Sequence, residues 1–264
     1  MRHAGVDFVA STEHSYKKPL EAYLWLSDIS HDLRTEIIPG VEGVSSEGID
    51  VIFLYRTGGD LRRALKDVQT FRWSACDVAR IAEDTGAITI VPHPFHIGKS
   101  SAGNVLSRRN YLRLLKMCDY VEIHNGSALA VERRLSKSRV RRLFKEARLK
   151  LDKTLNLPPE DRGEGLGWAI SSDAHYPGEQ YVVGKTDMDL APDEDVYDFL
   201  KGRIRFDYQS VFELCDGSIR SNTKLLRSFQ GVVKEGLIKE YLRTVCRARL
   251  LVVLGMYYGI FPTS

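Results

Sequence analysis

Two residues of types that bind divalent metals follow a short apolar segment that begins at residue 166. The segment 166–170 is apolar, and Ser171-Ser172-Asp173-Ala174-His175 follows it, with a carboxylate and an imidazole two residues apart. Side chains at positions i and i+2 of an extended segment lie on one face, so Asp173 and His175 are expected to leave a strand together. Zinc, manganese and iron accept both ligand types, whereas calcium prefers sites made only of oxygen. The pattern predicts a metal site.

Four earlier apolar segments also end in residues of this kind. They are residues 6–12, followed by Glu13 and His14; 37–41, followed by Glu42; 87–92, followed by His93; and 120–123, followed by His124. The C-terminal ends of parallel strands meet at one rim of a barrel, where such folds usually carry their chemistry. We therefore expect these side chains to share a single site.

The elements that must position these residues are short strands that alternate with helical patterns. Such alternation is typical of βα units and of a mainly parallel sheet. Apolar residues at helical spacing predict helices over 19–33, 73–85, 110–118, 128–155 and 191–202. Gly86 is expected to end the second of these helices.

The composition is that of a soluble globular protein. The chain has 264 residues, of which 43% are hydrophobic and 28% charged, and a single α/β barrel would use most of that length. A net charge of +3 does not by itself indicate a nucleic-acid partner. The four cysteines form no C-x-x-C pair, and the apolar segment 250–261 has about half the length that a bilayer requires. We expect a cytoplasmic protein without a membrane span.

The strand-end segments, taken in order, resemble a known family. Residues 4–14, Ala-Gly-Val-Asp-Phe-Val-Ala-Ser-Thr-Glu-His, resemble the "GhDhhhhTDH" motif of the PHP (polymerase and histidinol phosphatase) superfamily of metal-dependent phosphoesterases. The likeness continues through Pro39-Gly40-Val41-Glu42, Pro92-His93-Pro94, the segment 121–126 and Ser172-Asp173-Ala174-His175. Residues 193–203 also resemble the stretch "eeLhxALkxGR" that commonly follows. Together the resemblance covers about residues 4 to 205.

The resemblance implies a fold and a division of the chain. The expected fold is a distorted seven-stranded β/α barrel with a cluster of two or three divalent metal ions, zinc, manganese or iron, at its C-terminal rim. The PHP-like domain is expected to span residues 1–204. Residues 205–264, where the ligand-type pattern stops, are expected to form a helical C-terminal extension.

The resemblance also implies roles for individual residues. His14, Glu42, His93, Asp173 and His175 occupy motif positions that bind metal, and Glu42 is expected to bridge two ions. A carboxylate between two cations offsets their mutual repulsion. Metal-bound hydroxide would attack the phosphorus of a phosphoester, so no catalytic side chain is assigned.

The chain departs from the family pattern in three ways. The family opens with a strand that carries an H-x-H pair, and this chain begins inside the helix that should follow, so the barrel is expected to be incomplete at its N-terminus. Glu13 stands where the family usually has aspartate, and Asp50 where many members have a second histidine. Glu13, Asp50 and His124 are therefore candidates for metal ligands or pocket residues.

Candidate phosphate contacts and substrates can also be suggested from the sequence. His96, Lys99 and Arg108 come after the segment that ends in His93, so each could contact a phosphate from a loop. The expected substrate is a phosphorylated small molecule or a nucleotide, and the basic segment 133–153 leaves short nucleic acids open. The alternative hypothesis is a non-catalytic PHP-like scaffold that binds a partner through its C-terminal helices. The oligomeric state is not predicted.

Overall fold

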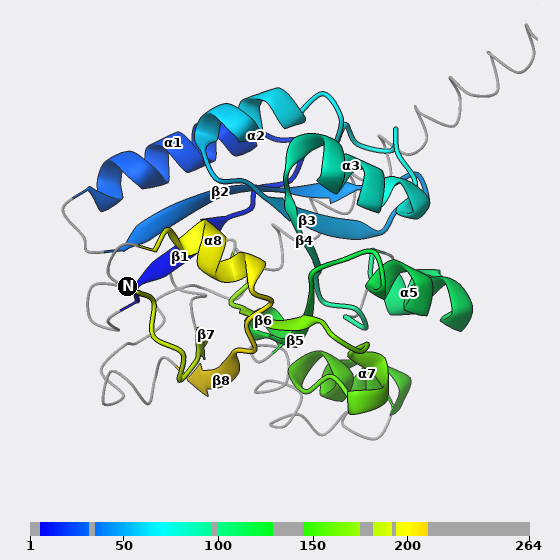
Figure 1. Cartoon of the computed structure of the whole chain (residues 1–264). Coiled ribbons are helices and arrows are strands. Elements are labelled where there is room, and N and C mark those ends of the chain that lie inside the picture. Colours follow the sequence, from blue (N-terminus) through cyan, green and yellow to red (C-terminus); the bar gives the residue numbers. More distant parts are fainter. Residues whose placement is uncertain are drawn as a thin grey trace, which may run out of the picture. The chain divides into compact units, whose positions relative to one another are not determined.

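Six strands form one curled sheet in this computed structural model, which describes residues 6–31, 35–96, 100–128, 145–174, 182–191 and 194–210. In their order across the sheet, which is also their order in the chain, they are β1 (Phe8–Ser11), β2 (Glu36–Val44), β3 (Asp50–Leu54), β4 (Ile88–Val91), β5 (Tyr120–Asn125) and β6 (Gly167–Ser171) (Figure 1). The pairs β1/β2, β4/β5 and β5/β6 are parallel. Strand β3 is antiparallel to both neighbours, which the sequence analysis did not predict. The curled sheet is half of a barrel, and a seventh barrel strand is not among the described residues.

The helices follow the strands much as predicted. They are α1 (Pro19–Ser30), α2 (Gly58–Ala64), η1 (Ala75–Asp77), α3 (Val78–Thr85), α4 (Ala102–Val105), α5 (Arg108–Leu115), α7 (Lys145–Leu155), η2 (Pro159–Asp161) and α8 (Val196–Lys201). Helix α3 ends at Gly86, whose φ of 69° is the left-handed conformation that glycine adopts without strain. Helix α2, which was not predicted, begins with a capping box between Thr57 and Asp60. Residues 129–144 of the predicted basic helix lie outside the described residues.

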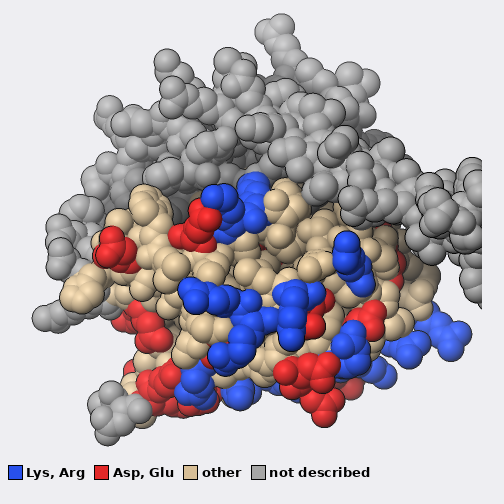
Figure 2. Space-filling model, turned by 90° about the horizontal axis from the view of Figure 1, so that it is seen from above, with Lys and Arg blue, Asp and Glu red and all other residues tan. Residues whose placement is uncertain are grey.

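The outer face of the sheet is apolar. Its alternate positions on β2 and β3, Val41, Val51 and Phe53, are fully buried in the larger hydrophobic core. Helices α1, α2 and α3 lie over this face (Figure 1). On the surface over these helices, basic side chains gather in the middle (Figure 2). Some basic side chains on the helices pair with acidic neighbours, as Arg80 of α3 does with Asp77 and Asp84. Binding of a short nucleic acid stays a prediction.

The inner face changes character along the strands. Ile38 on β2, Leu54 on β3 and Ile88 on β4 form a second core with Phe199 and Leu200 of α8. Farther along β2, the same face carries Glu42 and Val44. On β3, Ile52 pairs with Glu42, and Asp50 pairs with Val44. Because directly paired residues of antiparallel strands point to one face, Glu42 and Asp50 share the inner side of the sheet.

The boundary of the predicted C-terminal extension needs a correction. Residues 205–210 were assigned to the helical extension, but Arg205 forms a bridge to Trp168 and residues Asp207–Ser210 form strand β8. Strand β8 pairs antiparallel with β7 (Val182–Lys185). The physical reason is the burial of Phe206 in the inner core, which ties this stretch to the sheet. Residues 211–264 lie outside the described residues, so the helices expected there remain predictions.

The described part of the chain belongs to one compact unit. Within it, no helix combines the length and the apolar character that crossing a bilayer would need.

Candidate metal centre

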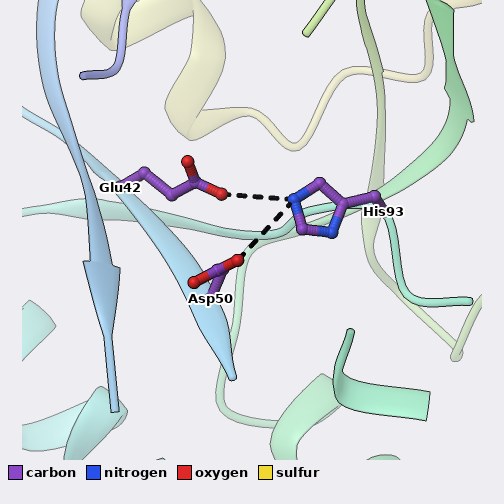
Figure 3. A group of neighbouring side chains, drawn as sticks. All are labelled: Glu42, Asp50 and His93. Atoms are coloured by element: carbon purple, nitrogen blue, oxygen red, sulfur yellow. Dashed lines mark hydrogen bonds and ion pairs between the residues drawn. The ribbon is translucent and has the colours of Figure 1, made fainter. Parts of the chain in front are cut away.

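Three buried side chains with metal-binding groups converge on the inner face of the sheet (Figure 3). Nε2 of His93 lies 3.2 Å from Oε1 of Glu42 and 4.0 Å from Oδ2 of Asp50. The three ligand-type atoms all lie within 4.8 Å of one another. Glu42 and Asp50 come from neighbouring strands, and His93 comes from the loop after β4 (Figure 3).

His93 reaches this group through an unusual backbone conformation. Ile90 on β4 pairs with Ile52 and faces the inner side, so simple alternation would turn residue 93 outward. The φ of His93 is 30°, in the left-handed region that residues with a β-carbon rarely adopt. This turn redirects the ring toward Glu42. Asp173, two residues after the end of β6, also has positive φ, 47°. Backbone strain of this kind clusters at functional sites.

His14 contacts the second oxygen of Glu42. Its Nδ1 lies 2.8 Å from Oε2. The β1/β2 ladder explains this, because its register extends beyond β1 to a bridge between His14 and Glu42. There the backbone N–H of Ser15 donates to the Glu42 carbonyl at 2.8 Å. Each carboxylate oxygen of Glu42 therefore faces one imidazole.

Glu122 and Asn125 on β5 form hydrogen bonds with His93 and Asp173. The Glu122 carboxylate accepts a hydrogen bond from the backbone N–H of His93. Asn125 donates through Nδ2 to Glu122 at 3.1 Å and to Oδ2 of Asp173 at 3.3 Å. A register shift between Glu122 and His124 leaves one extra residue on β5, so Asn125 lies on the same side as Glu122.

The electrostatics of the group centre on His93. Burial alone lowers the pKa of His93, but the hydrogen bond and charge of Glu42, with smaller contributions from Asp173 and Asp50, outweigh burial and raise the pKa to about 10. Burial raises the pKa of the Glu122 carboxyl, although the positive charge of His93 opposes this. The carboxylates thus favour a positive charge at the position of the ring.

These donors fit a divalent transition metal. Two carboxylates and an imidazole match the ligand chemistry of zinc, manganese or iron. Their separations of 3.2 and 4.0 Å are those of atoms that can share one ion. Nδ1 of His93 is buried and has no hydrogen-bond partner among the described residues, which leaves the ring's polar surroundings incomplete.

The other predicted site residues lie elsewhere. The Glu13 carboxylate accepts from its neighbour's N–H and pairs with Lys17 at 3.1 Å. His124 points away from the group, stacks on Tyr208 with ring centroids 4.1 Å apart, and contacts the carbonyl of Leu155 through Nδ1. Burial lowers its pKa, which favours the neutral ring.

Two of the three predicted phosphate contacts, His96 and Arg108, are among the described residues. The ring of His96 lies near His93, with centroids 6.0 Å apart. Arg108 instead pairs with the buried Asp161 beside a hollow of about 300 Å³, whose lining residues are Phe95, Gly103, Arg108, Tyr111, Lys153, Glu160 and Asp161. Lys99 and the predicted ligand His175 lie outside the described residues.

Sequence reasoning did not select Glu122 or Asn125. A signal was present for Glu122, because it is a charged residue within the apolar segment 120–123. A carboxylate buried in such a strand requires hydrogen-bond partners or a cation. Asn125 had no comparable signal, since its position depends on the register shift.

Comparisons with known proteins found similar solved structures only. No family model and no curated protein matches it. One similar solved structure is the lesion-specific endonuclease PfuEndoQ from Pyrococcus furiosus, at 12% identity and a TM-score of 0.44, over 78% of this chain and 50% of that one. Another is a two-domain protein from Bacteroides vulgatus containing a predicted PHP-like metal-dependent phosphoesterase, at 16% identity and a TM-score of 0.36, over 81% and 55%. The chain spans about half the length of each, and at these values neither likeness establishes a shared function.

Proposed function

We propose that this protein is a metal-dependent hydrolase of phosphoester bonds. The observation that carries the proposal is the convergence of Glu42, Asp50 and His93, three buried side chains of metal-binding type from separate segments. Two of them stand at motif positions of the PHP superfamily, and His14, a third motif residue, contacts Glu42. A chance cluster would not be expected to select the same positions.

We assign metal binding to His14, Glu42, Asp50 and His93, together with Asp173 and His175 from the last motif. Glu42 is the candidate bridging ligand, because its two oxygens face different imidazoles. A bound divalent ion would polarise the phosphoester and lower the pKa of a water molecule. The number of ions, two or three, rests on the family resemblance.

Other residues of the chain would orient these ligands. Glu122 holds the backbone of His93 in its left-handed turn. Asn125 ties Asp173 to Glu122, so the last motif is connected to the strand beside it. Supporting contacts of this kind typically change metal affinity by about 10- to 100-fold when removed.

The proposed substrate is a phosphorylated small molecule or a nucleotide. His96 is the candidate phosphate contact, because its ring lies beside that of His93. Arg108 is engaged with Asp161, so we do not assign it to the substrate.

Metal content and hydrolysis test the proposal together. Protein purified without chelator should retain zinc, manganese or iron by mass spectrometry, and should hydrolyse p-nitrophenyl phosphate or its diester after loading with the retained metal. His93→Ala should lose both properties. His31→Ala, which removes an exposed histidine after α1, is the matched control and should keep both. A wild-type chain that holds no ion above background would refute the proposal and favour the scaffold hypothesis.

A further inference from the structure

One short segment, residues 100–104, contacts both the loop that carries His93 and the strand that carries Asp50. We propose that Gly103 and Asn104 are positioning residues, which fix the separation of these two candidate ligands from outside the group itself. The inference rests on the proposed function only in treating Asp50 and His93 as ligands. The brace is defined as residues 100–104 and includes the start of α4.

The brace holds the His93 loop by its carbonyl groups. Asn104 donates through Nδ2 to the carbonyl of His96 at 2.8 Å, and Ser101 donates through its hydroxyl to the same oxygen at 3.1 Å. The backbone N–H of Gly103 donates to the carbonyl of Pro94 at 2.8 Å. Within the loop, the N–H of His96 donates to the carbonyl of His93 at 3.0 Å. The loop is therefore closed on itself and anchored at two carbonyl groups.

The same brace holds the first residue of β3. The backbone N–H of Asp50 donates to the carbonyl of Ser100 at 2.9 Å. Asp50 and Ser101 are each only 1% exposed, so these contacts lie away from water. Because Ser100 contacts Asp50 and Asn104 contacts the His93 loop, a change in the conformation of the brace would alter the position of His93 relative to Asp50.

Gly103 allows this contact to be close. A β-carbon at this position would lie 2.8 Å from the carbonyl oxygen of Pro94 and 2.5 Å from a ring carbon of Phe95. The first of these is a backbone atom, which cannot move without moving the loop. Only glycine therefore fits between α4 and the loop.

The left-handed turn at His93 explains why a brace is needed. A residue with a β-carbon leaves this conformation unless surrounding contacts hold it. The Glu122 carboxylate holds the N–H of His93 from one side. The brace holds the following three residues from the other side, so loss of either support should loosen the ring.

Hydrogen exchange and metal titration on the full chain test the inference separately. The test variants are Asn104→Asp, which keeps the shape but removes the donor, and Gly103→Ala. The matched controls are Asn110→Asp, at an exposed position of α5, and Gly59→Ala, where a β-carbon would meet nothing closer than 3.5 Å. Amide exchange of His93, Phe95 and His96 is measured in metal-free protein, and Mn²⁺ affinity is measured by calorimetry after chelator treatment.

Both test variants should exchange these amides about tenfold faster, and the dissociation constant for Mn²⁺ should rise about tenfold. The controls should match the wild type, with melting temperatures showing that every variant is folded. Wild-type exchange rates in Asn104→Asp would overturn the inference, whether or not Gly103→Ala folds. If the wild type binds no Mn²⁺, Zn²⁺ or Fe²⁺, the proposed function fails, while the exchange rates still decide whether the brace acts on the loop.

Discussion

Buried carboxylates are balanced in two different ways in this molecule. Asp161 is 2% exposed and is paired with the Arg108 guanidinium and with the Lys153 ammonium, whose Nζ lies 3.0 Å away. In the candidate metal centre, Glu42 faces imidazole rings on both oxygens. Arginine and lysine carry a permanent charge at neutral pH, whereas an imidazole carries one only when protonated.

The difference separates a structural site from a candidate functional one. The charge of Asp161 is neutralised by the chain itself, as expected for a contact that joins α5, α7 and η2. Glu42 and Asp50 raise the pKa of His93, which favours a proton on its ring beside them, and such a proton can exchange for a metal ion. A buried cluster whose compensating charge is exchangeable is therefore the better candidate for ligand binding.

The largest expected effect would test the comparison directly. Asp50→Asn should weaken metal binding by more than about 100-fold, beyond what the loss of a supporting residue typically costs. Asp161→Asn, the same substitution at the other site, should leave metal affinity unchanged. Calorimetric titration with Mn²⁺ and Zn²⁺ measures both. Equal losses in the two variants would show that the sites are not independent.

The next effect concerns folding stability. Asp161→Asn should lower the free energy of unfolding by about 2 kcal/mol, less than the 3–5 kcal/mol for breaking a fully buried pair. The reason is that the side chains of Arg108 and Lys153 remain 49% and 40% exposed. In metal-free protein, Asp50→Asn should cost less than Asp161→Asn, because it removes one of several neighbouring negative charges. Chemical denaturation measures the free energy of unfolding of both variants. A larger loss in Asp50→Asn than in Asp161→Asn would contradict the prediction.

A smaller effect is expected at the support behind His93. Glu122→Gln should weaken metal binding by about tenfold, because a neutral amide oxygen accepts more weakly than a carboxylate from the N–H of His93 and from Nδ2 of Asn125, which share one oxygen of Glu122. Glu160→Gln, at an exposed position beside Asp161, is the control. Titration of the two variants should separate them, and equal affinities would remove Glu122 from the metal centre.

The smallest expected effect is a change in the free energy of unfolding at Asp77, a partly exposed carboxylate outside both buried sites. Hydrogen bonds from the backbone and hydroxyl of Ser74, and then from Arg80, hold the pKa of Asp77 below its usual range. A lowered folded-state pKa stabilises the fold above the unfolded-state pKa, and that stability is lost as the pH falls through the folded-state value. Asp77→Ala should therefore cost about 1 kcal/mol at pH 7 and less in acid. Urea denaturation at pH 7 and pH 3 measures the change, and a cost that grew in acid would contradict it.

Local patterns in the sequence predicted much of the sheet and part of the site. The apolar segments before Glu42 and His93 are strands, and Gly86 ends α3 as expected. Glu42 and His93, which the sequence analysis expected to share one site, lie close together, with Oε1 and Nε2 3.2 Å apart. Metal binding by them stays a prediction. The predictions of strands and of the helix end depend on residues close together in the chain.

The remaining features depend on contacts between distant residues. The antiparallel pairing of β3 sets Asp50 beside Glu42, and the left-handed turn at His93 reverses the direction that alternation alone would give its side chain. Strand β8 pairs with β7 in a separate two-stranded sheet, although residues from 205 onward were expected to form a helical extension. Register, turn conformation and burial are properties of the packed chain, so a single sequence carries little trace of them.

The extra residue on β5 has a consequence for how this strand can vary among relatives. Ala169 pairs with Glu122 and Ile170 with His124, so Ile123 has no partner on β6. Removing one residue here would restore regular alternation and still leave the glutamate and the asparagine on the inner face. Alignments of homologues should therefore open single-residue gaps at or beside Ile123, and shorter sequences should retain both inward side chains.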